Sequence, residues 1–301
     1  MLKQVHASDL HLLRVFIAVA EERGIAAAQY RLNVAPSTIS TQLSHLEDRL
    51  GLKLCQRGRA GFSLTDEGRA VLDAAYVLQD DLNEFAGSVS QLKGEAVGEV
   101  RIAIIDNLVF QPDLHLHQAL RSLRNKYPNI NFQLYNMSPD EIETALLAQK
   151  VDMGITWVMN QLPSLSRTNL MNETQLIMCG RHHPFFEADD EDISEQMIES
   201  TDWVARTYPL PRTFPFSRPH VTSAKAHSME TVAHFILAGT HLGYLPEHYA
   251  GRWIQEEQMR IIHKNRFNYQ VPLDLAVRTD MLETPVIRIC REEILAVHKQ
   301  A

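Results

Sequence analysis

The sequence has few cysteines and no long hydrophobic run. Its 301 residues include only Cys55, Cys179 and Cys290, an odd number of cysteines lying far apart. This usage argues against a disulfide framework and favours a reducing compartment. No stretch approaches the roughly 18 consecutive apolar residues of a membrane-spanning helix. We therefore expect a cytoplasmic chain without a membrane partner.

The sequence also lacks an excess of basic residues. Lys and Arg number 29 against 37 Asp and Glu, which gives a net charge of −8 and counts against nucleic-acid binding by the chain as a whole. The charge is unevenly spread, however. Residues 1–64 carry eight basic and five acidic side chains, whereas residues 65–301 carry 21 and 32. This change of sign indicates two modules with different partners.

Sequence signatures of catalysis and metal binding are missing as well. The chain contains no C-x-x-C, H-E-x-x-H, G-x-x-x-x-G-K-[ST] or G-x-G-x-x-G pattern. Its closest histidine pairs are His115 with His117 and His182 with His183, and neither has a carboxylate or thiol at ligand spacing. We expect no catalytic residue, no metal site and no cofactor, and an enzyme is the disfavoured interpretation.

The first part of the chain has the pattern of three short helices and a hairpin. The third helix carries an apolar stripe at steps of four, three and four, ending in Leu50 before Gly51. Two short strands then flank a turn rich in glycine and arginine. The expected helices cover residues 9–23, 25–32 and 37–50, with Ser8 as the first N-cap, Gly24 ending the first helix, Asn33 closing the second and Pro36 opening the third.

This order of elements is that of a winged helix-turn-helix, in which the third helix enters the major groove of DNA. Short polar side chains at its start allow close approach, and its N-terminal amides favour phosphate. A small helical subdomain with a solvated arginine turn is the alternative. The candidate DNA-binding residues are Ser37, Thr38, Ser40, Thr41, Gln42, His45, Arg57 and Arg59.

A long amphipathic helix follows, with Thr65 as its candidate N-cap and Asp66 and Glu67 in its first turn. Its apolar residues recur in alternating steps of four and three, the spacing of a coiled-coil seam. One helix cannot bury such a seam alone, so we expect a two-fold dimer. The alternative is a long helix packed on the following module. The seam comprises Val71, Ala75, Leu78, Leu82, Phe85, Val89 and Leu92.

Residues 18–65 resemble the LysR-type transcriptional regulators. The resemblance implies a winged helix-turn-helix, a dimerising linker helix and a two-lobed effector domain, in a regulator that is often a tetramer. It is carried by Ala18-Val19-Ala20-Glu21, by Arg31 to Ser40, by Leu46-Glu47-Asp48-Arg49-Leu50-Gly51, by Lys53-Leu54, by Arg57 and by Leu64-Thr65-Asp66-Glu67-Gly68.

The chain departs from the family pattern at three positions. Ala35 stands where the family usually has a capping serine, and it offers no side-chain acceptor. Thr41 stands where the family often has arginine, the residue best suited to guanine, so base reading should depend less on guanine. Cys55 replaces a common phenylalanine, and we interpret it as a small buried hydrophobic residue rather than a redox sensor.

The rest of the chain alternates strands and helices. Strands expected over 100–105, 130–135 and 151–156 are separated by helices over 114–126 and 139–149, an order that implies a parallel sheet with right-handed crossovers. Further strands are expected over 175–179, 203–206 and 273–278, and helices over 228–238 and 285–299. The resemblance adds that this α/β domain has two lobes, like periplasmic solute-binding proteins. Matching family positions are Pro128, Asp152, Gly239, Gly243, Leu245 and Pro246.

The expected organisation is thus a two-lobed α/β effector domain preceded by an α+β winged helix-turn-helix and a long linker helix. The DNA-binding domain covers 1–65, the linker helix 66–93 and the effector domain 94–301. Within the effector domain, lobe I covers about 98–162 and 268–301, and lobe II covers about 163–267.

Ligands of such sheets bind beyond the carboxyl ends of strands and at helix N-termini. Ser138 and Ser228 also suit a purely capping role, and Asp106 and Asn107 suit any strand-to-helix turn. Arg206 is the natural partner for an anion, which favours a small carboxylate as effector. The candidate effector-binding residues are Asp106, Asn107, Ser138, Thr156, Arg206, Thr207 and Ser228.

Together these patterns predict a LysR-type regulator whose dimer or tetramer binds a palindromic site on double-stranded DNA and responds to a small-molecule effector between the lobes. A solute-binding or enzymatic α/β module with an N-terminal oligomerisation piece is the alternative.

Overall fold

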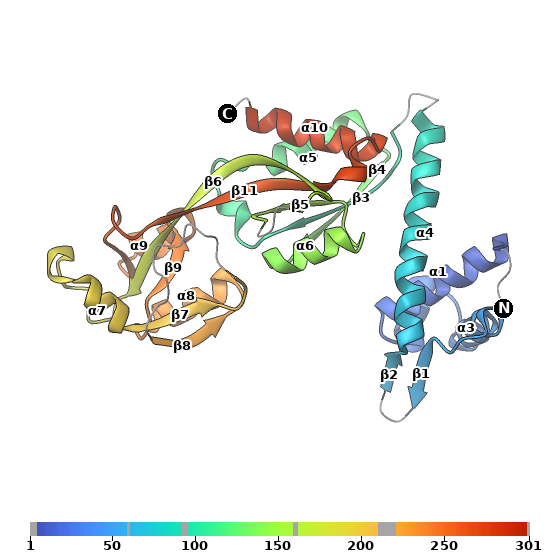
Figure 1. Ribbon diagram of the computed structural model, residues 1–301, viewed down its shortest axis with the longest axis horizontal. Coiled ribbons are helices and arrows are strands. Elements are labelled where there is room, and N and C mark those ends of the chain that lie inside the picture. Colours follow the sequence, from blue (N-terminus) through green and yellow to red (C-terminus); the bar gives the residue numbers. More distant parts are fainter. Residues whose placement is uncertain (1–4, 59–60, 92–95, 159–161, 210–220, 300–301) are drawn as a thin grey trace. The chain divides into compact units, whose positions relative to one another are not determined.

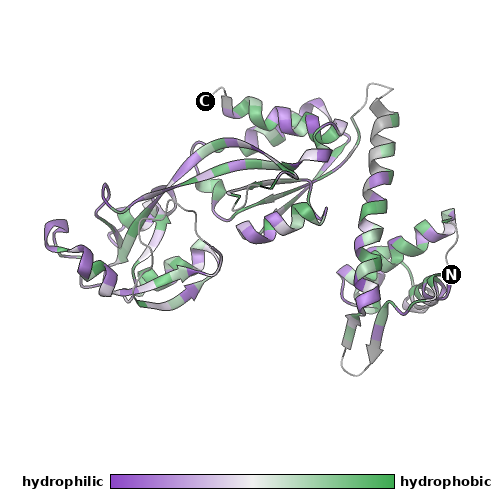
Figure 2. Ribbon diagram, in the orientation of Figure 1, coloured by the Kyte–Doolittle hydropathy of each residue, from purple (hydrophilic) through white to green (hydrophobic). Residues whose placement is uncertain are grey.

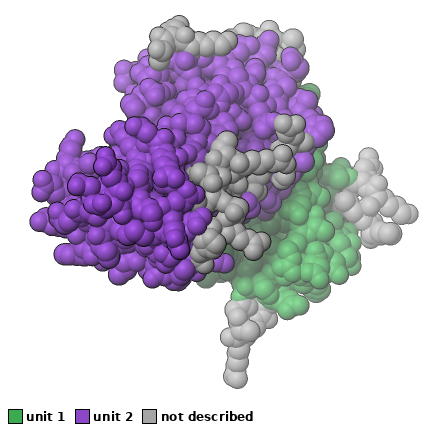
Figure 3. Space-filling view, turned by 60° about the vertical axis from the view of Figure 1, so that its left-hand side comes forward, with its two compact units in different colours: residues 1–85 green, residues 86–301 purple. Residues whose placement is uncertain are grey.

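The computed structural model describes residues 5–58, 61–91, 96–158, 162–209 and 221–299. The chain divides into two compact units, residues 1–85 and 86–301, which Figure 3 shows in different colours. Each unit contains its own cluster of buried hydrophobic side chains. No helix among the described residues is both long and apolar enough to cross a membrane.

In the first unit, three helices precede a two-stranded hairpin, and a long helix follows it (Figure 1). The apolar stripe expected on the third helix is its buried face: Ile39 and Leu43 are fully buried and Leu46 nearly so. The elements are α1 (Ala7–Glu21), α2 (Ile25–Leu32), α3 (Pro36–Leu50), β1 (Cys55–Gly58), β2 (Gly61–Leu64) and α4 (Asp66–Gln91).

The predicted ends of these helices are partly confirmed. Asn33 and Gly51 adopt the left-handed conformation that closes α2 and α3, and the Thr65 hydroxyl accepts a hydrogen bond from the Gly68 amide at 2.8 Å. The prediction that Ser8 caps α1 is wrong. His6 is the N-cap, because the carboxylate of Asp9 accepts its amide at 2.9 Å.

The connection between α1 and α2 also differs from expectation, because α1 ends at Glu21 instead of continuing to Arg23. Arg23 adopts a positive φ of 53°, and Gly24, with φ of 156°, is the N-cap of α2. The left-handed residue is therefore Arg23, but Gly24 does help to end α1, as predicted, because its amide donates to the Val19 carbonyl at 3.0 Å. Gly24 is at the same time the N-cap of α2.

The second unit is built on one seven-stranded sheet of order β10-β6-β11-β5-β3-β4, with β9 paired to β6, and a separate parallel pair β7-β8. The three strands of the expected βαβαβ unit are parallel, as predicted. The strands are β3 (Gly98–Ile104), β4 (Ile130–Asn136), β5 (Met153–Thr156), β6 (Leu165–Gly180), β7 (Asp202–Arg206), β8 (Val221–Ala226), β9 (Gly243–Pro246), β10 (Met259–Ile262) and β11 (Tyr269–Arg278).

Helices pack on this sheet and on the second lobe of the unit (Figure 1). In Figure 2, hydrophilic residues predominate on α7, whereas hydrophobic residues run along the central strands. The helices are α5 (Leu116–Lys126), α6 (Pro139–Leu147), α7 (Glu195–Ser200), α8 (Met229–Leu237), α9 (Glu247–Gln255) and α10 (Pro285–Lys299), with short 3-10 helices at Leu108–Phe110, Asp190–Asp192 and Thr279–Met281.

The strands β6 and β11 run side by side and antiparallel through both lobes (Figure 1). β6 has 16 residues, so the predicted strand over 175–179 is only its second half. The first half alternates exposed and half-buried positions and contains no apolar run, which is why its sequence does not resemble a core strand. Because β6 leads into the second lobe and β11 leads out of it, these two strands are the connection between the lobes.

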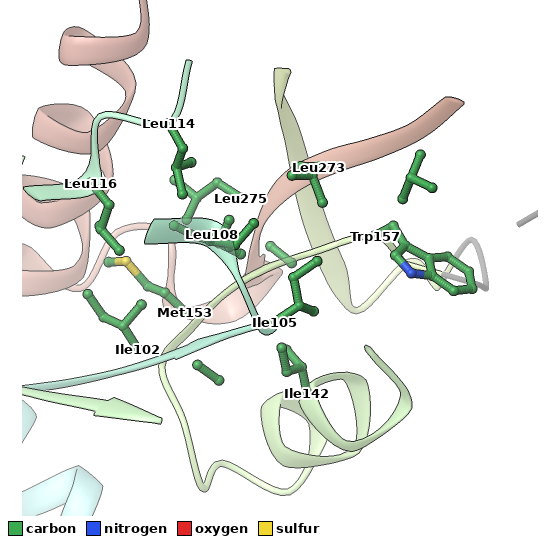
Figure 4. Packing of buried hydrophobic residues seen from close by; sticks show 14 of the residues in the cluster. Ile102, Ile105, Leu108, Leu114, Leu116, Ile142, Met153, Trp157, Leu273 and Leu275 are labelled. Atoms are coloured by element: carbon green, nitrogen blue, oxygen red, sulfur yellow. The ribbon is translucent and has the colours of Figure 1, made fainter. Parts of the chain in front are cut away.

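Two clusters of buried hydrophobic side chains pack the second unit. The first extends from β3, β5 and β11 into the second lobe, where it includes Trp203 and Tyr244; Figure 4 shows the part of it that contains Ile102, Met153 and Leu275. A second cluster joins β6 and β9 to α8 through Leu176, Leu245 and Ile236. The region between the two lobes is where a ligand is expected to bind.

Candidate DNA-binding and effector sites

The start of α3 presents a row of small polar side chains. Ser37, Thr38, Thr41 and His45 are exposed, on the face of the helix opposite Ile39. Pro36 occupies the first turn and Ala35 is the N-cap, so no side-chain oxygen covers the first amides of α3. These amides are free to approach a phosphate.

The remaining residues predicted on α3 are partly engaged within the unit. The Thr41 hydroxyl donates to the Ser37 carbonyl at 3.0 Å, which leaves its oxygen as an acceptor. Gln42 is half-buried, and its Nε2 lies 3.0 Å from Nε2 of His11 on α1. Ser40 is also half-buried. Thr41 is therefore better placed than Gln42 to read a base.

The hairpin after α3 is a wing whose register pairs Cys55 with Leu64 and Gly58 with Gly61. The backbone of Arg57 lies in β1, whereas Arg59 lies outside the described residues. Cys55 is buried, as expected for a small hydrophobic residue.

Glu47 joins α3 to the wing, a contact that sequence reasoning missed. Its buried carboxylate accepts the amide of Leu54 at 2.9 Å and the ammonium of Lys53 at 2.8 Å. Burial alone would raise the pKa of Glu47, but these hydrogen bonds outweigh it and hold the pKa below its ordinary value. The ionised carboxylate fixes the wing relative to the recognition helix.

The seam expected on α4 is divided. Ala75 is buried within the first unit and Val71 packs against that unit's core, so these two residues already have partners. Leu82, Phe85 and Val89 are 38%, 70% and 40% exposed. Leu78 and Leu82 line a groove of about 310 Å³ together with residues of α1 and α2, among them Arg14 and Arg31. Leu92 lies outside the described residues.

Asp106, at the end of β3, contacts the other lobe. Its carboxylate accepts the amide of Met229, the first residue of α8, and Nδ2 of Asn107 donates to it at 3.1 Å. The N-terminus of α8 is thus already occupied by a carboxylate from the same chain.

Most of the other predicted effector residues serve local structure. Ser138 and Ser228 are the N-caps of α6 and α8. Thr156 is completely buried, and its hydroxyl donates to the Trp157 carbonyl at 3.1 Å. Thr207 is exposed, with its hydroxyl 3.0 Å from Nδ1 of His227.

Arg206, one of the predicted effector residues, lines a cavity. The cavity measures about 20 Å³, roughly the space of one water molecule. Both lobes and both connecting strands contribute to it. Its walls are Ile105, Trp157, Glu173, Gln175, Arg206, Tyr208, Met229, Tyr269 and Val271.

The cavity holds a buried carboxyl group. Glu173 is 2% exposed, and Nε2 of Gln175 donates to it at 2.6 Å. Burial raises the pKa of Glu173 to about 7, although the nearby Arg206 lowers it. Nε2 of His248 lies 3.6 Å from the carboxyl, but burial lowers the pKa of His248. Each of the two groups is shifted toward its neutral form, so the contact is not a strong ion pair near neutral pH.

Two polar atoms in the cavity wall lack a hydrogen-bond partner among the described residues: Nη1 of Arg206 and Oε1 of Gln175. The other terminal nitrogen of Arg206 donates to the Tyr244 carbonyl at a long 3.4 Å. Buried polar atoms normally find partners, so these two atoms are available to hydrogen-bond a ligand or a water molecule in the cavity. The sequence signal for this site is weak: Glu173 and Gln175 are two residues apart on one strand, which places them on the same face.

The histidine pairs take structural positions. His183 is buried and accepts the Phe185 amide at 3.1 Å, and the ring of His115 lies against that of His298. Within the described ranges, no group of three His, Cys, Asp or Glu residues could hold a metal ion.

Both units match LysR family models. Residues 10–69 match the bacterial regulatory helix-turn-helix protein, lysR family, and residues 93–299 match the LysR substrate binding domain. This chain belongs to the LysR family of transcriptional regulators. Since members of the family are DNA-binding regulators, the family places the chain among regulators and not among enzymes.

Similar LysR proteins extend over nearly the whole chain. The HTH-type transcriptional activator BauR of Pseudomonas aeruginosa is 36% identical over 278 residues, covering 92% of this chain and 91% of BauR. The HTH-type transcriptional regulator BenM of Acinetobacter baylyi is 26% identical over 185 residues, covering 62% and 60% of the two chains.

Solved LysR structures share the fold. Full-length CbnR, crystallised with its target DNA, matches with a TM-score of 0.63 at 21% identity, covering 96% of this chain and 99% of CbnR. ArgP of Mycobacterium tuberculosis matches with a TM-score of 0.60 at 17% identity and covers 98% of both chains. A winged helix-turn-helix joined to a two-lobed domain is therefore the family architecture.

Proposed function

We propose that this LysR-type regulator self-associates as a dimer or tetramer, binds a palindromic DNA site and responds to a small effector held between the two lobes. In this proposal residues 1–65 bind DNA, residues 66–93 dimerise and residues 94–301 bind the effector. The exposed side chains of Leu82, Phe85 and Val89 on α4 support dimerisation. Since the target is DNA, we place its action in the cytoplasm.

The proposal rests on one observation: this LysR-family chain contains both a candidate DNA-binding surface and a candidate effector site. The start of α3 offers exposed hydroxyls and uncovered amides to DNA, and the other unit holds a cavity with an unpartnered guanidinium nitrogen on Arg206. An anionic group on the effector would accept a charge-assisted hydrogen bond from that nitrogen. Binding would then alter the contact between the lobes, and through α4 the spacing of the two recognition helices.

Retardation of DNA from upstream of the protein's own gene tests the DNA-binding part. We expect site-specific retardation that falls steeply as salt rises from 50 to 200 mM, because phosphate contacts release counterions. Retardation no stronger than that of an unrelated DNA would contradict the proposal and favour a solute-binding or enzymatic module with an N-terminal oligomerisation piece. The proposal of effector control is wrong if no ligand that binds the protein changes its small-angle scattering or its footprint on DNA.

A further inference from the structure

We propose that the cavity between the lobes binds a small amino acid, in the broad sense of a ligand that carries both a carboxylate and a protonated amine. The inference rests on the proposed function, because it names the chemical class of the effector. It is argued from the two charged walls of the cavity, Arg206 at the end of β7 and Glu173 on β6.

The arginine wall requires an anion. Nη1 of Arg206 is buried without a partner among the described residues, and its guanidinium lies 5.9 Å from the ring centre of Tyr208. A ligand carboxylate would give this donor a charge-assisted hydrogen bond. The site therefore favours a ligand with an acidic group, in agreement with the sequence-based expectation.

The glutamate wall favours a donor, and preferably a cation, although Gln175 already donates to Glu173. Glu173 is an acceptor when ionised, and the free Oε1 of Gln175 is a second acceptor two residues along the same strand. Trp157 and Tyr269 also line the cavity, and aromatic faces attract an ammonium group. A ligand amine would satisfy both oxygens in an aromatic surrounding.

A ligand with only one of these charges fits poorly. A plain carboxylate would lie close to Glu173, and the repulsion would hold Glu173 protonated and leave Gln175 Oε1 unpartnered. A plain amine would add a positive charge near Arg206 and leave its Nη1 without a partner. A ligand with both groups pairs each charge and adds no net charge to a buried site.

The size of the cavity favours a small ligand and requires the lobes to move. About 20 Å³ is far below the roughly 300 Å³ of ordinary ligand pockets. The contact between Asp106 and the Met229 amide spans the two lobes, and so does the 3.7 Å contact between Glu141 and His227. These contacts must lengthen as the ligand enters.

Calorimetry on the full-length protein tests the ligand class. The probes are alanine, glycine, 3-aminopropanoate, 4-aminobutanoate and 5-aminopentanoate, each compared with the matching acid without its amine and the matching amine without its acid. We expect at least one amino acid to bind about tenfold to a hundredfold more tightly than either matched compound. Equal binding of the plain acid, or no binding of any amino acid at 10 mM, would overturn the proposal.

Two substitutions assign the charges. Glu173→Gln should remove most of the preference for the amino acid over the acid, whereas Arg206→Gln should remove the preference over the amine. Glu247→Gln and Arg252→Gln are the matched controls, since both residues are exposed on α9 and pair elsewhere. Unchanged preferences in Glu173→Gln protein with native circular dichroism would reject the assignment.

The unmodified protein offers an independent measurement. With the pKa of Glu173 at about 7, pairing with an ammonium should release a proton near neutral pH. Affinity should therefore rise about ninefold between pH 6 and pH 8. Proton uptake, or affinity that falls with pH, would overturn the proposal. The two proposals can fail separately. If the protein still retards its DNA and a ligand other than an amino acid binds in the cavity, the proposed amino-acid class is wrong and the proposed function stands.

Discussion

Thr41 and Gln42 are neighbours on the recognition helix, but their polar atoms have different tasks. Gln42 contacts His11 and helps hold α3 against α1, whereas Thr41 uses its proton within α3 and keeps an oxygen exposed. An exposed acceptor matches the amino groups of adenine or cytosine in the major groove. This geometry agrees with the expectation that guanine contributes less here than it does with arginine at this position.

Replacing Thr41 with alanine should change base preference at one position of each half-site by about 1–3 kcal/mol. Arg57→Ala on the wing should instead weaken binding to all DNA sequences alike. It should also lower the slope of log affinity against log salt concentration by about one. Selection of bound sequences from a random pool, for both variants, measures the difference. If Thr41→Ala selects the same sites as the unmodified protein, the base-reading face is assigned wrongly.

The buried carboxyl of Glu173 should make the unliganded protein less stable as pH rises. Its pKa rises from an ordinary 4.5 to about 7 on folding, so its protonated form is favoured by burial. The contribution is fully present below pH 4.5 and lost as pH rises through 7, with a size of about 3 kcal/mol. Glu173→Gln should reduce the fall in Tm between pH 5 and 8; an unchanged pH profile would show that Glu173 does not cause it.

At the scale of elements, local signals in the sequence predict local structure well. The stripe of α3, the left-handed Asn33 and the Thr65 cap depend on residues within one or two turns, and all three were predictable. The start of α1 was not predictable from the sequence. The cap is completed by the Asp9 carboxylate and not by the Ser8 hydroxyl, and Arg49 on α3 also binds this carboxylate.

Strand β6 shows why longer-range features escaped prediction. Its first half pairs with β11 about a hundred residues later in the chain, so its polar residues are ordered by a distant strand. Glu173 and Gln175 escaped prediction for the same reason. Burial turns Glu173 into a distinctive group, whereas in the sequence it is one of many acids. The end of β3 was predicted as a ligand site, but Asp106 is used to bind the Met229 amide.

The exposed part of α4 allows a matched test of dimerisation. Val89 lies on the predicted seam and Val77 lies off it, and both are 40% exposed. Val89→Glu should weaken the dimer at least tenfold because it places charge in an apolar seam, whereas Val77→Glu should not. Sedimentation velocity across a concentration series measures both, and equal effects would locate the interface elsewhere.

At the scale of the molecule, the net charge of −8 averages two opposite distributions. The first 64 residues are basic by three charges, and the acidic remainder belongs to the linker and effector domain. A dimer doubles the basic wings, while the acidic remainder is repelled by phosphate. The overall charge is thus compatible with DNA binding once the chain is divided into domains.

The contact between the lobes can be weakened at Asp106, whose partner Met229 lines the cavity. Asp106→Ala removes the acceptor of the Met229 amide, so that amide should exchange its hydrogen about tenfold faster or more. The amide of Thr231 is an internal control, because the Ser228 hydroxyl still accepts it. Equal acceleration at both amides would indicate general loosening of α8 rather than loss of a specific link.

The two connecting strands have a mechanical consequence. β6 and β11 form a paired ribbon with a register shift between Leu273 and Asp274, where the Asn169 amide binds the Asp274 carboxylate at 3.0 Å. The twist between neighbouring strands varies widely and is larger in two-stranded ribbons. Rotation of one lobe against the other should therefore be accommodated by a change in the twist between β6 and β11.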